Sequence, residues 1–61
     1  MTFSELINNG EITAAEYVCL FDYDTRHFID EGGIEELEQG YGDRVVQNYY
    51  YRNNMVEVYV Y

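Results

Sequence analysis

The first ten residues carry hydrophobic side chains at the spacing of a helix. Phe3, Leu6 and Ile7 follow one another at intervals of three and one, so they fall on one side of a helix. Thr2, with Glu5 three residues later, forms a potential capping box. The sequence NNG at residues 8–10 favours a left-handed stop. The pattern therefore predicts a short helix at the start of the chain.

Residues 13–22, TAAEYVCLFD, permit two interpretations. Thr13 with Glu16 forms a second possible capping box, which favours a helix. Residues 17–21 are mostly β-branched, aromatic or otherwise suited to a strand. The following DYDTR is rich in turn formers, and HFID has the character of a short return strand. We expect a β-hairpin that pairs residues 15–22 with residues 26–30.

The segment EGGIEELEQGYGD, residues 31–43, predicts a second helix. Ile34, Leu37 and Tyr41 have helical spacing. Acidic residues crowd the beginning of this segment, where the helix dipole favours negative charge. Gly40 and Gly42 are expected to end the helix.

The last eighteen residues, RVVQNYYYRNNMVEVYVY, predict a second hairpin. Asn53-Asn54 suits a two-residue loop, because asparagine tolerates a positive φ. This loop sets Tyr51 opposite Val56 and Tyr49 opposite Val58. One face, expected to lie under the helices, then holds Val45, Gln47, Tyr49, Tyr51, Val56, Val58 and Val60. The other face holds Val46, Asn48, Tyr50, Arg52, Met55, Glu57, Tyr59 and Tyr61.

These elements predict an α+β fold in the order αββαββ. We expect a single domain, residues 1–61, with a four-stranded antiparallel sheet and the two short helices on one face. A chain of this length buries a small core, so support from a partner chain, another copy or a different protein, is expected.

The charge of the chain is unusual. Twelve acidic residues face three arginines, and there is no lysine, so the formal net charge is −9. The chain is not of the disordered acidic type, because 48% of its residues are hydrophobic and 18% are aromatic. Direct nucleic-acid binding is disfavoured, since no basic patch is present. With no signal peptide and no apolar run long enough for a bilayer, a cytoplasmic protein is expected.

No residue pattern indicates catalysis. Asp22-Tyr23-Asp24 looks like the start of a calcium loop, but Arg26 and His27 occupy the next diagnostic positions, so an Asx-type hairpin turn is favoured. The single histidine has no partner for a metal pair, and the lone Cys19 is expected to be a small buried hydrophobe. We therefore expect no enzyme activity, no catalytic residue, no metal and no cofactor.

Acidic residues and tyrosines remain as candidates for partner binding. Seven acids lie within 17 residues, and helix capping and solvation account for several of them but not for the absence of lysine. Rigidly held carboxylates imitate a row of phosphates and bind arginine and lysine. Three tyrosines are expected on the uncovered sheet face. The candidate residues are Asp22, Asp24, Asp30, Glu31, Glu35, Glu36, Glu38, Tyr50, Tyr59 and Tyr61.

In length, charge and element order the chain resembles small acidic proteins that phages and mobile elements encode against host defences, including anti-CRISPR proteins. The phrase FDYDTRHFIDEGGIEELEQGYGDRVV, residues 21–46, is typical of this resemblance. Several such proteins are DNA mimics. The resemblance implies inhibition of an RNA-guided effector, by occupying the surface that binds DNA or reads the PAM.

Two hypotheses for function remain open at this point. The first is an anionic inhibitor that binds the basic nucleic-acid groove of a host defence complex. The second is a structural or assembly module of a phage or mobile element, which forms a homodimer through its tyrosine-rich sheet face. A mixed mode, in which tyrosines stack on the arginines that the acids pair with, depends on whether the two groups are adjacent.

Overall fold

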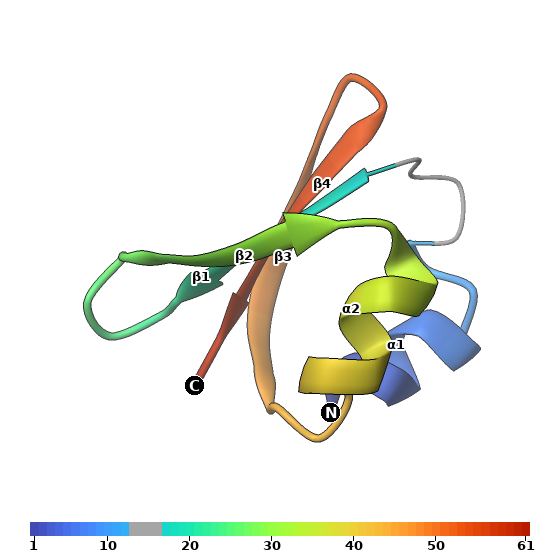
Figure 1. Ribbon diagram of the computed structural model, residues 1–61, viewed down its shortest axis with the longest axis horizontal. Helices are drawn as coiled ribbons and strands as arrows, with labels where there is room; N and C mark the ends of the chain where they lie inside the picture. The colour runs from blue at the N-terminus through green and yellow to red at the C-terminus, as the bar shows by residue number, and fades with distance from the viewer. Residues whose placement is uncertain (13–16) are drawn as a thin grey trace.

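The chain folds as helix, hairpin, helix, hairpin, in the order that the hydrophobic pattern predicts. The computed structural model describes residues 1–12 and 17–61. Its elements are α1 (Phe3–Asn8), β1 (Tyr17–Asp22), β2 (Phe28–Gly32), α2 (Ile34–Tyr41), β3 (Val46–Arg52) and β4 (Met55–Val60) (Figure 1). The α+β class is confirmed, and so is a strand rather than a helix from residue 17. The proposed capping box of Thr13 and Glu16, and the beginning of the first strand at residue 15, lie outside the described residues.

Both helices begin with the help of a glutamate side chain. In α1 the Thr2 N–H donates to Glu5 Oε1 at 2.7 Å, and the Glu5 N–H donates to Thr2 Oγ1 at 3.2 Å, which confirms the capping box. At the start of α2 the Gly33 N–H donates to Glu36 Oε1 at 3.4 Å. These contacts satisfy backbone donors that have no partner inside a helix.

The sheet has the strand order β2-β1-β4-β3. Each hairpin is antiparallel, as expected, although the return strand β2 begins and ends two residues later than the expected 26–30, because the turn at Asp22 extends to His27. The central strands β1 and β4, however, run parallel. The expectation of a wholly antiparallel sheet was therefore wrong for the central pair. The reason is the connection through α2. The helix carries the chain back between the two edge strands, so β3 points the same way as β2 and β4 the same way as β1.

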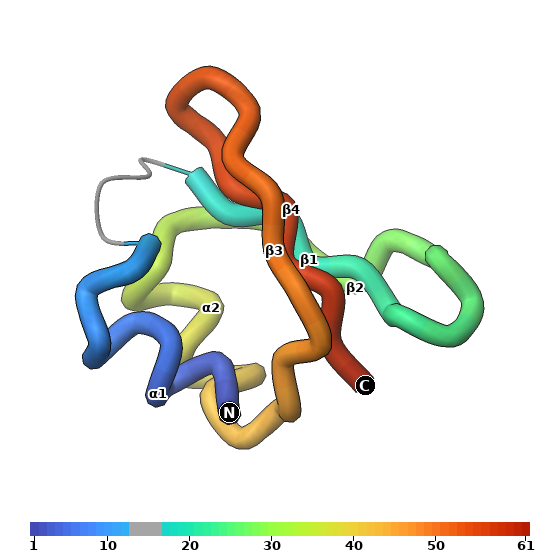
Figure 2. The backbone as a smooth tube through the Cα atoms, turned by 180° about the vertical axis from the view of Figure 1, so that it is seen from behind, coloured from blue at the N-terminus to red at the C-terminus, as the bar shows by residue number. Residues whose placement is uncertain are grey.

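The core lies between the helices and one face of the sheet. The two helices lie beside each other next to the sheet (Figures 1 and 2). Alternate residues of the two central strands are fully buried there, and both helices contribute side chains to the same cluster. Every second residue of a strand faces the core, just as every third or fourth residue of α1 does. The buried cluster comprises Phe3, Leu6, Ile12, Val18, Leu20, Leu37, Val56, Val58 and Val60.

The expected register of the last hairpin is confirmed near its loop and wrong at its far end. Tyr49 lies opposite Val58, and residues 48–52 follow the expected pairing. A bulge at residue 47 then shifts the register, so that Val46 lies opposite Val60. As a result Val46 packs against the core and Val45 is exposed, the reverse of the expectation.

The two tyrosines assigned to the core face differ in burial. Tyr49 packs against the core, and its hydroxyl donates to Glu11 Oε1 at 3.0 Å. Tyr51 remains 47% exposed, and its hydroxyl donates to the Glu11 carbonyl oxygen. Tyr51 is therefore not a core residue. Its ring makes an edge contact with the Tyr49 ring, and its hydroxyl ties β3 to the segment that follows α1.

Candidate protein-binding surface

The sheet face opposite the core carries Phe28 and Tyr50, the aromatic side chains with the highest exposed fraction. We call it the outer face. Its residues are those that the strand register places on the side of the sheet away from the buried cluster. They are Tyr17, Cys19 and Phe21 of β1, Phe28 and Glu31 of β2, Asn48, Tyr50 and Arg52 of β3, and Met55, Glu57 and Tyr59 of β4.

Four rings on the outer face form a continuous series, which we call the aromatic row. Ring centroids are 6.0 Å apart for Phe28 and Phe21, 5.2 Å for Phe21 and Tyr59, and 5.9 Å for Tyr59 and Tyr50. Each strand supplies one ring, so the row crosses the whole sheet. The register creates it, because Phe21 lies opposite Phe28 on one side and Tyr59 on the other.

A second aromatic pair joins this row through an arginine. Tyr23 and Tyr61 have ring centroids 5.5 Å apart. The guanidinium of Arg26 lies 4.9 Å from the Tyr23 ring centre and 5.5 Å from that of Tyr59. The structure therefore links all three candidate tyrosines, Tyr50, Tyr59 and Tyr61, in one cluster. Sequence reasoning missed Phe21 and Phe28, because only the parallel pairing of β1 with β4 brings them beside the tyrosines.

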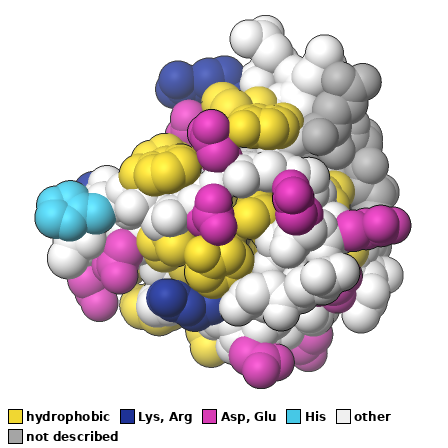
Figure 3. All heavy atoms as spheres, in the orientation of Figure 1, with side chains coloured by type: hydrophobic (Ala, Val, Ile, Leu, Met, Phe, Trp, Pro, Cys, Tyr) yellow, Lys and Arg dark blue, Asp and Glu magenta, His cyan; other side chains and the backbone are white. Residues whose placement is uncertain are grey.

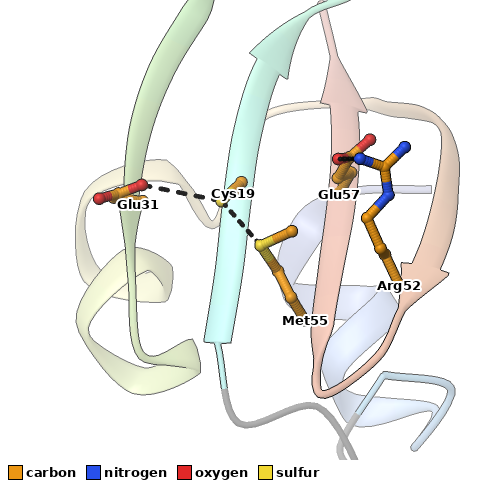
Figure 4. A network of polar contacts seen from close by, with 5 residues as sticks. All are labelled: Cys19, Glu31, Arg52, Met55 and Glu57. Carbon is orange, nitrogen blue, oxygen red and sulfur yellow. Dashed lines mark hydrogen bonds and ion pairs between the residues drawn. The ribbon is translucent and has the colours of Figure 1, made fainter.

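Polar and sulfur-containing side chains from all four strands also lie on the outer face (Figure 4). Cys19 Sγ lies 3.8 Å from Glu31 Oε2 and 3.3 Å from Met55 Sδ. Further along, Arg52 forms an ion pair with Glu57 at 3.7 Å. Burial, together with the nearby Glu31 carboxylate, raises the pKa of the Cys19 thiol. The thiol is thus neutral at physiological pH, which agrees with its expected role as a small buried side chain.

Glu31 also contacts Tyr17, the first residue of β1, on the outer face. Its carboxylate accepts a hydrogen bond from the Tyr17 hydroxyl, which raises the pKa of that tyrosine. Tyr17 is 40% exposed. Of the seven candidate acids, Glu31 is the one that the strand register places on the outer face with the tyrosines.

Three other candidate acids hold local structure together. Asp22 Oδ1 accepts the backbone N–H groups of Asp24 and Thr25, at 2.9 and 3.1 Å, which confirms the Asx-type turn and lowers the pKa of Asp22. Asp30 Oδ2 accepts from the Tyr41 hydroxyl at 3.0 Å, and so ties α2 to β2. Glu36 caps α2, as described above.

The remaining candidate acids, Asp24, Glu35 and Glu38, make no side-chain hydrogen bond or ion pair with any described residue. Asp24 lies in the turn after β1, whereas Glu35 and Glu38 lie on α2. Carboxylates are scattered over the face shown in Figure 3 and do not gather in one patch. The structure therefore does not bring the seven acids together as a single cluster.

All three arginines are used within the chain. Arg26 covers the Tyr23 and Tyr59 rings, and Arg52 pairs with Glu57. Arg44 Nη1 donates to the Tyr61 carbonyl oxygen at 2.7 Å. Within the described residues the Arg52–Glu57 contact is the one ion pair, so the other described carboxylates are not paired with an arginine.

Residues 1–12 and 17–61 form no pocket and no group of three or more potential metal ligands. None of the helices described is long and apolar enough to cross a membrane. The chain matches no protein-family model, no curated protein and no solved structure.

Proposed function

We propose that this protein is an anionic inhibitor that binds a basic protein surface. The target class is the nucleic-acid groove of a host defence complex inside the host cell. The resemblance noted above makes a CRISPR effector the first candidate. The observation that supports the proposal is the uncompensated charge, twelve acids against three arginines that are all held by contacts within the chain.

Two features of the structure favour a charged contact with a protein. Carboxylates on helices and strands stand on a backbone that is already ordered, so pairing them with a partner's arginines orders side chains and not the chain itself. Glu35 and Glu38 lie on α2 without internal partners among the described residues, and Asp24 projects from a turn that Asp22 holds rigid. A spread of such charges suits a broad basic groove better than a single deep pocket.

The proposal is tested with Glu35→Lys/Glu38→Lys, which spares the capping residue Glu36. Capture from host lysate at low and high salt identifies the partner of the wild-type protein. Affinity for that partner should fall by about tenfold or more in the double variant and should weaken steeply with salt. Glu35→Lys alone should also weaken binding, and Asp43→Lys, an equal charge change outside the candidate set, is the control for this single variant. Unchanged affinity in the double variant would contradict the proposal.

A homodimer through the outer face is the second candidate function, as expected of an assembly module. The observation that favours it is the exposure of the aromatic row, in which Phe28 and Tyr50 are both 55% exposed. Sedimentation at tens of micromolar protein tests it. A dimer that dissociates in Tyr59→Ala would support this candidate, and a monomer throughout would exclude it.

A further inference from the structure

We propose that the outer face is the docking surface for an arginine-bearing segment of the basic partner. The aromatic row supplies rings on which guanidinium groups stack, and Glu31 supplies a carboxylate beside them. This inference rests on the proposed function, because it names the chemistry that the anionic protein recognises. The strand register places the acid Glu31 on the same face as Tyr50 and Tyr59, so acids and tyrosines are able to bind one partner together.

The rings are accessible from outside the molecule. Phe28 and Tyr50, the two ends of the aromatic row, are each 55% exposed, and Tyr17 beside Glu31 is 40% exposed. The helices contribute their buried residues to the core on the opposite side of the sheet. A planar cation therefore has room to lie against either end of the row. Half-exposed rings beside carboxylates are typical of surfaces that bind arginine.

The chain itself shows how this surface binds a guanidinium. Arg26 lies over the Tyr23 and Tyr59 rings, at 4.9 and 5.5 Å from their centres. This distance is within the range of favourable cation–π contacts. Tyr59 belongs to the aromatic row. One ring of the row therefore already contacts a guanidinium, the group that we propose for the partner. Phe28 and Tyr50 offer further rings without an arginine over them among the described residues.

Charge complementarity favours arginine in the partner over a second copy of this chain. The outer face carries Glu31 and Glu57 with Arg52, and Arg26 lies over its Tyr59 ring, whereas the chain as a whole has a net charge of −9. Two copies that met through this face would bring two net charges of −9 together. A basic segment instead reduces this charge, and Glu31, which pairs with no arginine among the described residues, is available to its guanidinium groups. Arginine suits the rings better than lysine, because its planar guanidinium stacks and forms paired hydrogen bonds with carboxylate.

The test compares two short peptides of equal charge, one of alternating arginine and glycine and one of alternating lysine and glycine. The wild-type protein should bind the arginine peptide about three- to tenfold more tightly. Tyr50→Ala should remove most of this preference. Tyr51→Ala is the matched control, because Tyr51 is the next residue, is similarly exposed and lies on the opposite face. Thermal unfolding establishes that both variants are folded.

Amide chemical shifts of the wild-type protein provide a second measurement that needs no variant. The arginine peptide should shift the amides of outer-face residues in β2 and β3, around Phe28 and Tyr50. Shifts confined to α2, with equal binding of both peptides, would overturn the docking surface and leave the proposed function standing. Failure of both peptides to bind would overturn both. A dimer of the wild-type protein that Tyr50→Ala converts to a monomer would assign this face to a second copy and overturn the inference.

Discussion

The rings of Phe21 and Tyr59 are stacked across the parallel pair β1 and β4, with 5.2 Å between centroids and an interplanar angle of 20°. Tyr59 also makes an edge contact with Tyr50 and lies under the Arg26 guanidinium. Its hydroxyl makes no hydrogen bond with any described residue. The ring, and not the hydroxyl, is therefore the part of Tyr59 that holds the aromatic row together.

Replacement of this ring should destabilise the fold. Tyr59→Ala removes two ring contacts and one cation–π contact, so the free energy of unfolding should fall by about 1–3 kcal/mol. Tyr59→Phe keeps the ring and should change stability by less than about 0.5 kcal/mol. Urea unfolding followed by circular dichroism measures both values. Equal losses in the two variants would show that the hydroxyl matters more than the ring.

Two glycines of the second helical segment should respond in opposite ways to alanine. A methyl group at Gly42 would lie 2.7 Å from the Glu38 carbonyl oxygen and against Ser4 Oγ, where α1 approaches the end of α2. Gly42→Ala should therefore lower the free energy of unfolding by about 1–3 kcal/mol. Gly40 lies inside α2 with open space around it, so Gly40→Ala should raise stability by about 0.5–1 kcal/mol. Thermal melting of the two variants beside the wild type tests this contrast.

Alkaline pH should unfold the protein. Hydrogen bonds to carboxylates raise the pKa of Tyr17, Tyr41 and Tyr49 above the ordinary 10.0, and burial raises the pKa of Cys19 above 9.0. A raised pKa means that folding favours the neutral form. The stability that these groups contribute is therefore complete below their ordinary pKa values and is lost as pH rises through the folded values.

The urea midpoint measured from neutral pH to about pH 11 tests this dependence. Tyr41→Phe removes one of the groups, together with its hydrogen bond to Asp30, and should make the alkaline fall shallower. A midpoint that stays constant across the range, or a slope that Tyr41→Phe leaves unchanged, would contradict the assignment of the effect to these side chains.

Salt should stabilise the folded state at neutral pH. The net charge of −9 is offset by few internal pairs, so carboxylates repel one another in the folded chain more than in the extended one. Sodium chloride screens this repulsion and should raise the urea midpoint. Glu35→Gln/Glu38→Gln should raise the midpoint in low salt and reduce its dependence on salt. A midpoint that falls with added salt would indicate that attractive pairs dominate instead.

Local sequence patterns determined the elements of this protein and much of their register. The capping box of Thr2 and Glu5, the Asx turn at Asp22 and the loop at Asn53-Asn54 each act over a few residues, so their outcomes follow from the chain alone. The charge of −9 is likewise a property of the sequence. These are the features that the structure bears out.

The tertiary structure decided which distant residues meet. The return of the chain through α2 makes β1 and β4 parallel, and this pairing alone sets Phe21 beside Tyr59. The bulge in β3 exchanges the environments of Val45 and Val46. Hydrophobic periodicity identifies which face of a strand is buried, but not the direction of the strand or its neighbours. For that reason the sequence indicated tyrosines on an open face, and only the packing of the two hairpins joined them with Phe21, Phe28 and Glu31 into one surface.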